Sequence, residues 1–122
     1  SDEMACIKLA GNFMQDIVSG EIDNAFARIR PYFPMPEGEF ENLVSRTKNQ
    51  LKGNERELGS ILGYDFVKEE RVEDFLIRFT FVIKHDVTVT RWRFLYYKPE
   101  DGWMLNSFFW DNQVKGLFDS PD

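Results

Sequence analysis

The chain contains few of the residues that metal sites, disulfides and membrane spans require. It has one cysteine, Cys6, and one histidine, His85, among its 122 residues. A single cysteine excludes an internal disulfide, and one of each residue is too few for a transition-metal site. No apolar run approaches the roughly 18 residues that a membrane-spanning helix needs. We therefore expect no metal, no cofactor and no membrane span, with His85 exposed in a turn.

Positive charge is also scarce. The sequence has 15 Lys and Arg against 21 Asp and Glu, a net charge of −6, so a nucleic acid partner is not expected. It lacks repeats and Gly/Ser-rich linkers, and its length predicts one domain over 1–122. Because the chain begins at Ser1 without an initiator methionine, we expect that a signal peptide or a tag has been removed. The location is not determined by the sequence: a single cysteine fits the periplasm or the cytosol, and removal of a signal peptide would favour a periplasmic or secreted protein.

Aromatic residues are abundant at 16%, and most of them follow residue 60. Before that point, apolar residues at helical spacing predict three helices. The first helix ends at Gly20, the second spans 22–29 and is stopped by Pro31, and the third begins at Pro36 and ends near Gly59. The buried stripe of the first helix is expected to consist of Cys6, Ala10, Phe13, Met14 and Ile17.

Strict alternation of apolar and polar residues predicts strands in the second half. The expected strands span 62–70, 75–84, 88–97 and 103–111. Pro99 and Gly102 suit the turn before the last of them. The fold class is therefore predicted to be α+β, with three N-terminal helices packed on a curved four-stranded antiparallel sheet.

The register of the two middle strands follows from the turn between them. A turn at 85–86 places Phe79 opposite Trp92 and Arg78 opposite Arg93. The aromatic residues of both strands then share one face of the sheet. A slip of one residue would scatter them between the two faces, so the register is well specified.

This order of elements resembles the nuclear-transport-factor-2-like (cystatin-like) superfamily, and in particular its small bacterial members. The segments that carry the resemblance are 20–26, which resembles the start of their second helix, and 92–103. The resemblance implies a sheet and helices that enclose a conical cavity. It also implies several functions, because the superfamily includes isomerases, dehydratases, polyketide cyclases, transport adaptors and simple binding modules.

We expect a non-catalytic binding module of unknown role, with an aromatic-lined cavity for a small apolar or aromatic ligand. Two alternatives stay open: an isomerase, dehydratase or cyclase that uses a pocket tyrosine and a carboxylate, and a dimeric interaction domain with a filled core. No catalytic residue is assigned. The residues expected to contact the ligand are Tyr64, Phe79, Trp92, Phe94 and Tyr96.

Three arginines form the most distinctive polar feature of the sheet: Arg78, Arg91 and Arg93. Like charges on one sheet face need compensation from internal acids such as Asp65 or Glu69, from an anionic ligand, or from a partner subunit. We expect a homodimer through this face, unless the segment 111–118 folds back and leaves a monomer. The apolar residues expected there are Leu76, Val82, Val89, Leu95, Met104, Phe108 and Trp110.

Overall fold

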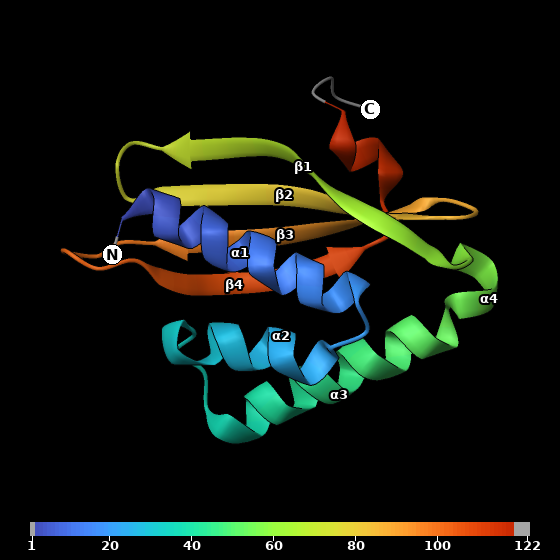
Figure 1. The fold of residues 1–122 in the computed structure, drawn as a ribbon. Helices are drawn as coiled ribbons and strands as arrows, with labels where there is room; N and C mark the ends of the chain where they lie inside the picture. The colour runs from blue at the N-terminus through green and yellow to red at the C-terminus, as the bar shows by residue number, and fades with distance from the viewer. Residues whose placement is uncertain (1, 119–122) are drawn as a thin grey trace.

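Helices occupy the first half of the chain and strands the second in the computed structural model, which describes residues 2–118 (Figure 1). The helices are α1 (Glu3–Val18), α2 (Ile22–Ile29), the 3-10 turn η1 (Arg30–Tyr32), α3 (Glu37–Gly53) and α4 (Glu55–Leu58). The strands are β1 (Ile61–Val72), β2 (Leu76–His85), β3 (Val89–Tyr97) and β4 (Met104–Asp111), followed by the 3-10 turn η2 (Val114–Leu117). The α+β prediction is confirmed. The expectation of N-terminal processing rests on Ser1, which lies outside the described residues.

Helix α1 has clear start and stop signals. The side chain of Asp2 caps it by accepting a hydrogen bond from the backbone N–H of Ala5 at 2.8 Å. The predicted stripe of five residues is buried along its length. The chain leaves the helix at Gly20, whose φ of +82° suits a residue without a side chain. These local signals explain why the first helix was predictable from the sequence.

The predicted third helix is two helices in the structure. Helix α3 ends at Gly53 and the short α4 follows, so the prediction of one helix as far as Gly59 is wrong. The break falls at Asn54, whose side-chain amide donates to the backbone carbonyl of Gln50 at 2.8 Å. A side chain that bonds the preceding turn in this way competes with continuation of the helix.

The sheet is an antiparallel meander with strand order β1-β2-β3-β4. Phe79 pairs with Phe94 and Phe81 with Trp92, so the predicted register is wrong by two residues. The hairpin turns at Asp86-Val87 rather than at 85–86, and β2 extends one residue further. The tip is held there because the Asp86 N–H donates to the Ser60 carbonyl at 3.0 Å. A slip of two residues keeps every side chain on its face, so the aromatic face is still predicted correctly.

His85 is a buried strand residue, and the expectation of an exposed turn histidine is wrong. Its side chain is 6% exposed, and its Nε2 lies 2.9 Å from the hydroxyl oxygen of Thr90. The same oxygen accepts a hydrogen bond from the indole N–H of Trp92 at 2.8 Å. Burial lowers the pKa of His85, so the ring stays neutral inside the protein at neutral pH.

The core is an aromatic cluster between the helices and one face of the sheet. Helix α1 lies across that face, and α2 and α3 follow it on the side of β4, with α2 between α1 and α3 (Figure 1). Phe13 of α1 occupies the centre of the cluster and is fully buried. Four rings surround it at centroid distances of 5.1–6.4 Å, namely Phe26, Trp92, Phe94 and Phe108. Edge-to-face contacts of this kind stabilise a core beyond the burial of apolar area alone.

An irregularity in the pairing of β3 with β4 changes which face two large side chains occupy. Pairing shifts between Leu95 and Tyr96, which leaves an extra residue in β4. As a result Phe108 packs in the core and Trp110 stacks on Trp92 with 4.8 Å between ring centroids. The prediction that Phe108 and Trp110 lie on the opposite face is therefore wrong. Strict alternation cannot anticipate such a bulge.

Candidate ligand-binding site

A cavity of about 240 Å³ lies between the first half of α1 and one end of the sheet. Helix α1 supplies one wall, and η1, β3 and the residue that precedes β4 supply the others. Its lining residues in the described part of the chain are Ala5, Cys6, Lys8, Leu9, Asn12, Tyr32, Tyr96 and Trp103. Three aromatic rings and the small side chains of α1 therefore shape this space.

Tyr96 brings the most informative polar atom to this cavity. Tyr96 is 1% exposed, and its hydroxyl has no hydrogen-bond partner among residues 2–118. Burial is the main cause that raises the pKa of Tyr96, with smaller contributions from Cys6 and Tyr32, which also line the cavity. Most buried polar atoms in proteins are hydrogen-bonded, so an unpartnered hydroxyl beside a cavity indicates a position where a ligand atom fits.

The inner wall of the cavity is uncharged at neutral pH. Burial raises the pKa of the Cys6 thiol to about 11, and burial also raises the pKa of Tyr96. Both groups therefore keep their protons. The charged residue among those that line the cavity is Lys8, which is exposed. The site thus combines a neutral interior, one buried hydroxyl donor and a cation toward solvent.

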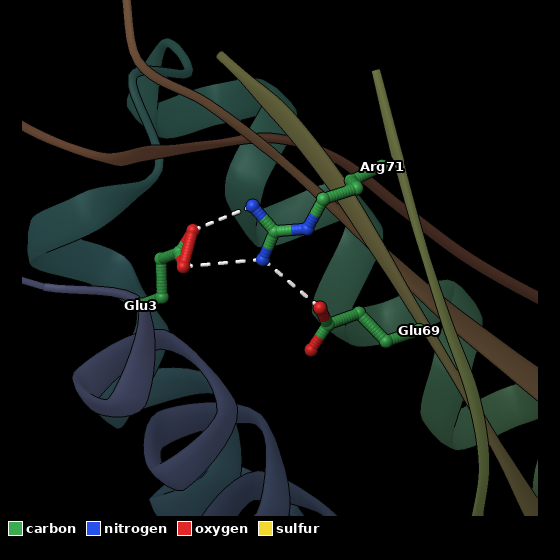
Figure 2. A network of polar contacts seen from close by, with 3 residues as sticks. All are labelled: Glu3, Glu69 and Arg71. Atoms are coloured by element: carbon green, nitrogen blue, oxygen red, sulfur yellow. Dashed lines mark hydrogen bonds and ion pairs between the residues drawn. The ribbon is translucent and has the colours of Figure 1, made fainter. Parts of the chain in front are cut away.

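A polar network fixes the helix that forms the cavity wall (Figure 2). The guanidinium of Arg71 on β1 binds both carboxylate oxygens of Glu3, with nitrogen–oxygen distances of 2.7 and 3.1 Å. It also donates to Glu69 at 2.9 Å. These hydrogen bonds lower the pKa of Glu3. The two-point contact holds the first turn of α1 against the end of β1, and so orients the adjacent Ala5 and Cys6.

The structure separates the aromatic residues that the sequence placed in one ligand pocket. Phe79, Trp92 and Phe94 are almost completely buried in the core, where other side chains surround them. Tyr64 is partly buried, and its ring packs 6.2 Å from that of Phe81. Tyr96 is the predicted residue that lines the cavity described above. The assignment of the other four to a ligand site stays a prediction.

Sequence reasoning missed most of the cavity wall. Helix α1 carries a second row of residues at helical spacing beside its buried stripe, namely Ala5, Leu9 and Asn12. This row was the feature of the sequence that could have predicted the cavity wall. Tyr32 follows Pro31 in η1, and Trp103 comes directly after the turn that ends at Gly102. Only the packing of η1 and this turn against α1 brings them together, which periodicity alone does not reveal.

The three arginines lie on the sheet face that points away from the helices. Arg78 pairs with Glu70 at 2.8 Å, and Arg91 pairs with Asp111 at 2.6 Å. Internal acids therefore compensate two of the arginines, but they are not the acids that the sequence suggested. Asp65 pairs with Lys84, and Glu69 pairs with Arg71.

Arg93 has a different environment from the other two arginines. It donates to the backbone carbonyl of Gly116 in η2 at 3.2 Å, and its buried Nε has no partner within the described part of the chain. Burial and the charges of Arg78 and Arg91 lower its pKa. The C-terminal segment thus folds back, but it lies against Arg91 and Arg93 rather than over Phe108 and Trp110.

Two kinds of site are not seen within residues 2–118. No group of three or more His, Cys, Asp or Glu side chains is placed to hold a metal ion. No helix in that range is long and apolar enough to cross a membrane. Comparison of the chain with protein-family models, with curated proteins and with solved structures finds no match.

Proposed function

We propose that this protein is a non-catalytic binding domain that holds a small, mostly apolar ligand in the cavity beside α1. The observation that supports the proposal is the buried, unpartnered hydroxyl of Tyr96 at a cavity of about 240 Å³. Ligand sites in proteins are commonly concave and apolar, with a few placed polar groups that orient the ligand. This cavity has that composition.

The energetics of Tyr96 favour an occupant. Leaving a buried hydroxyl without a hydrogen bond costs about 1–3 kcal/mol. A buried water usually needs about three polar partners, whereas the walls of this cavity are largely apolar. Water would therefore be held weakly there. A ligand that offers one acceptor and fills the apolar space would displace it favourably.

A substitution at the cavity wall tests the proposal. Ala5 lines the cavity, whereas its neighbour Met4 is exposed and does not line it. We expect the neutral aromatic probe 4-methoxytoluene to bind the wild type, and the large side chain of Ala5→Trp to weaken binding roughly tenfold or more by occupying the space. Titration calorimetry measures both dissociation constants.

Met4→Trp is the matched control, because it adds the same side chain one position away. It should bind the probe within about twofold of the wild type. If Ala5→Trp and Met4→Trp bind equally well, the probe occupies another place and the proposal is wrong. The same conclusion follows if the folded wild-type protein does not bind the probe at millimolar concentration.

The enzyme alternative has less support. An isomerase or cyclase mechanism needs a base beside the bound substrate, and the residues that line the cavity within the described range include no carboxylate. Cys6 and Tyr96 both have raised pKa values, so neither is poised to accept a proton at neutral pH. Membership of the nuclear-transport-factor-2-like superfamily stays a proposal that rests on the order of helices and strands.

A dimeric interaction domain is the second candidate. The observation that favours it is a groove of about 330 Å³ on the outer face of the sheet. It is lined by Glu70, Arg71, Val72, Leu76, Arg78 and Leu95. Apolar side chains flanked by arginine are typical of interface surfaces. A second copy of this chain would cover them on both subunits if the two sheets packed face to face about a two-fold axis.

Sedimentation analysis of Leu95→Glu tests the dimer. We expect the wild type to sediment as a dimer and the variant, which places a charge in the centre of the apolar contact, to sediment as a monomer. Val87→Glu, at the exposed tip of the hairpin, is the control and should remain dimeric. Wild-type protein that stays at monomer mass at high concentration would contradict the dimer.

A further inference from the structure

The walls of the cavity beside α1 constrain the shape of what can bind there. Three of the lining side chains are aromatic: Tyr32, Tyr96 and Trp103. Aromatic rings prefer edge-to-face or offset contacts with other rings, so these walls suit a planar molecule. The volume of about 240 Å³ exceeds the roughly 150 Å³ of an apolar cavity that holds benzene. One substituted aromatic ring therefore fits the space.

A buried hydrogen-bond donor belongs to one of the residues that line the cavity. Tyr96 keeps its proton, and its hydroxyl has no partner among the residues that the structure describes. The thiol of Cys6 beside it is a weak donor and is also protonated. An oxygen acceptor on the inner edge of the ring would satisfy the Tyr96 hydroxyl. An alkyl group at the same place would leave that hydroxyl unpartnered.

A lysine lines the exposed part of the cavity wall. This residue is Lys8, and Lys98 lies over the lining tryptophan with its Nζ 5.3 Å from the ring centroid. The two acids at the start of α1 already have partners. Asp2 caps the helix, and Glu3 binds Arg71. A negatively charged group on the ligand would be attracted to Lys8, whereas a positively charged group would be repelled by it.

We propose that the ligand is an aromatic acid whose ring carries an oxygen acceptor on the side opposite its carboxylate. The ring lies among the three aromatic side chains, the acceptor takes the hydrogen bond of Tyr96, and the carboxylate faces Lys8. This inference rests on the proposed function, because it assigns the ligand class for the same cavity. It predicts two preferences of the protein: for a ligand with an oxygen acceptor over one with an alkyl group at the same place, and for an acid over an amine.

Three probes separate these two preferences. 4-Methoxybenzoate carries both features, 4-ethylbenzoate replaces the ether oxygen by a methylene group, and 4-methoxybenzylamine reverses the charge. We expect 4-methoxybenzoate to bind about two- to tenfold more tightly than 4-ethylbenzoate, the range that one net hydrogen bond gives. We also expect it to bind more tightly than the amine, by a factor that falls as salt is added.

Two variants assign each preference to a residue. Tyr96→Phe removes only the hydroxyl and should abolish the preference for the methoxy over the ethyl compound. Lys8→Met removes the charge and should abolish the preference for the acid over the amine. Lys52→Met, on α3, removes a lysine that does not line the cavity and should change neither preference.

The outcomes distinguish this inference from the proposed function. Suppose that 4-methoxytoluene binds in the cavity of the wild-type protein. The ligand class is then wrong if 4-methoxybenzoate binds no more tightly than 4-methoxybenzylamine, or no more tightly than 4-ethylbenzoate. The cavity would still be a binding site. The class is also wrong if the preferences survive in Tyr96→Phe and Lys8→Met. If 4-methoxytoluene does not bind the folded wild type, the proposed function is wrong, and the ligand class, which rests on it, is wrong as well.

Discussion

Replacing Phe13 by alanine is expected to lower the free energy of unfolding by about 3–5 kcal/mol, the range for removing a large aromatic side chain from a core. Phe13 is fully buried and lies at the centre of four other rings. Its removal leaves a cavity that these rings cannot close without leaving their present contacts. Urea denaturation followed by tryptophan fluorescence measures the change.

Phe118 supplies the matched control for this experiment, because it is 67% exposed. Phe118→Ala removes the same side chain and should change the free energy of unfolding by less than about 1 kcal/mol. Equal losses in the two variants would show that α1 does not pack on the sheet through Phe13. The helix would then not be held where the cavity requires it.

Gly59→Ala is expected to lower the free energy of unfolding by at least about 2 kcal/mol. Gly59 has φ +86° and ψ −176°, a conformation that is essentially restricted to glycine, and the backbone strain alone costs about 1–3 kcal/mol. An added Cβ would also lie 2.7 Å from the Cβ of Asp86. Asp86 bonds the backbone of Ser60, so the hairpin tip would have to move. Thermal unfolding by circular dichroism measures the loss.

Gly20→Ala separates the two effects that act at Gly59. Gly20 also has a positive φ, +82°, but an added Cβ would meet no atom within 4 Å. It should therefore show the conformational strain alone, about 1–2 kcal/mol. If Gly59→Ala is no more destabilising than Gly20→Ala, the hairpin tip is not packed against the connection between α4 and β1.

The helices and strands were largely predictable because local chemistry specifies them. Gly20 and Pro36 act within one turn of the chain, and each marks the end or the start of a helix in the structure. The alternation over 75–84 and 88–97 placed the aromatic face of the sheet correctly, because a side chain's face depends only on counting residues along one strand.

The register and the last strand were less predictable, since both depend on contacts with distant segments. The hairpin turns at Asp86-Val87 because these residues bond to Leu58 and Ser60, and this in turn makes His85 a buried strand residue. The bulge in β4 likewise moves two large side chains to the other face without a glycine or proline to mark it.

The candidate site was only partly predictable for the same reason. Tyr96 was expected in a ligand pocket because it lies on the aromatic face of the sheet. Phe79, Trp92 and Phe94 are buried in the core, where Phe13 of α1 lies against Trp92 and Phe94. The cavity lies beside the small side chains of Ala5 and Cys6 on α1. Tyr32 of η1 and Trp103, the residue before β4, supply other parts of its wall.

The most direct test of the central claim, that the cavity beside α1 binds a small ligand, uses the three tryptophans as reporters. Trp103 lines the cavity, whereas Trp92 is fully buried in the core and Trp110 stacks on it. In protein labelled with 5-fluorotryptophan, the fluorine NMR signal of Trp103, assigned with Trp103→Phe, is expected to shift most when 4-methoxytoluene is added. A larger shift at Trp92 or Trp110, or no shift at saturating probe, would contradict the claim.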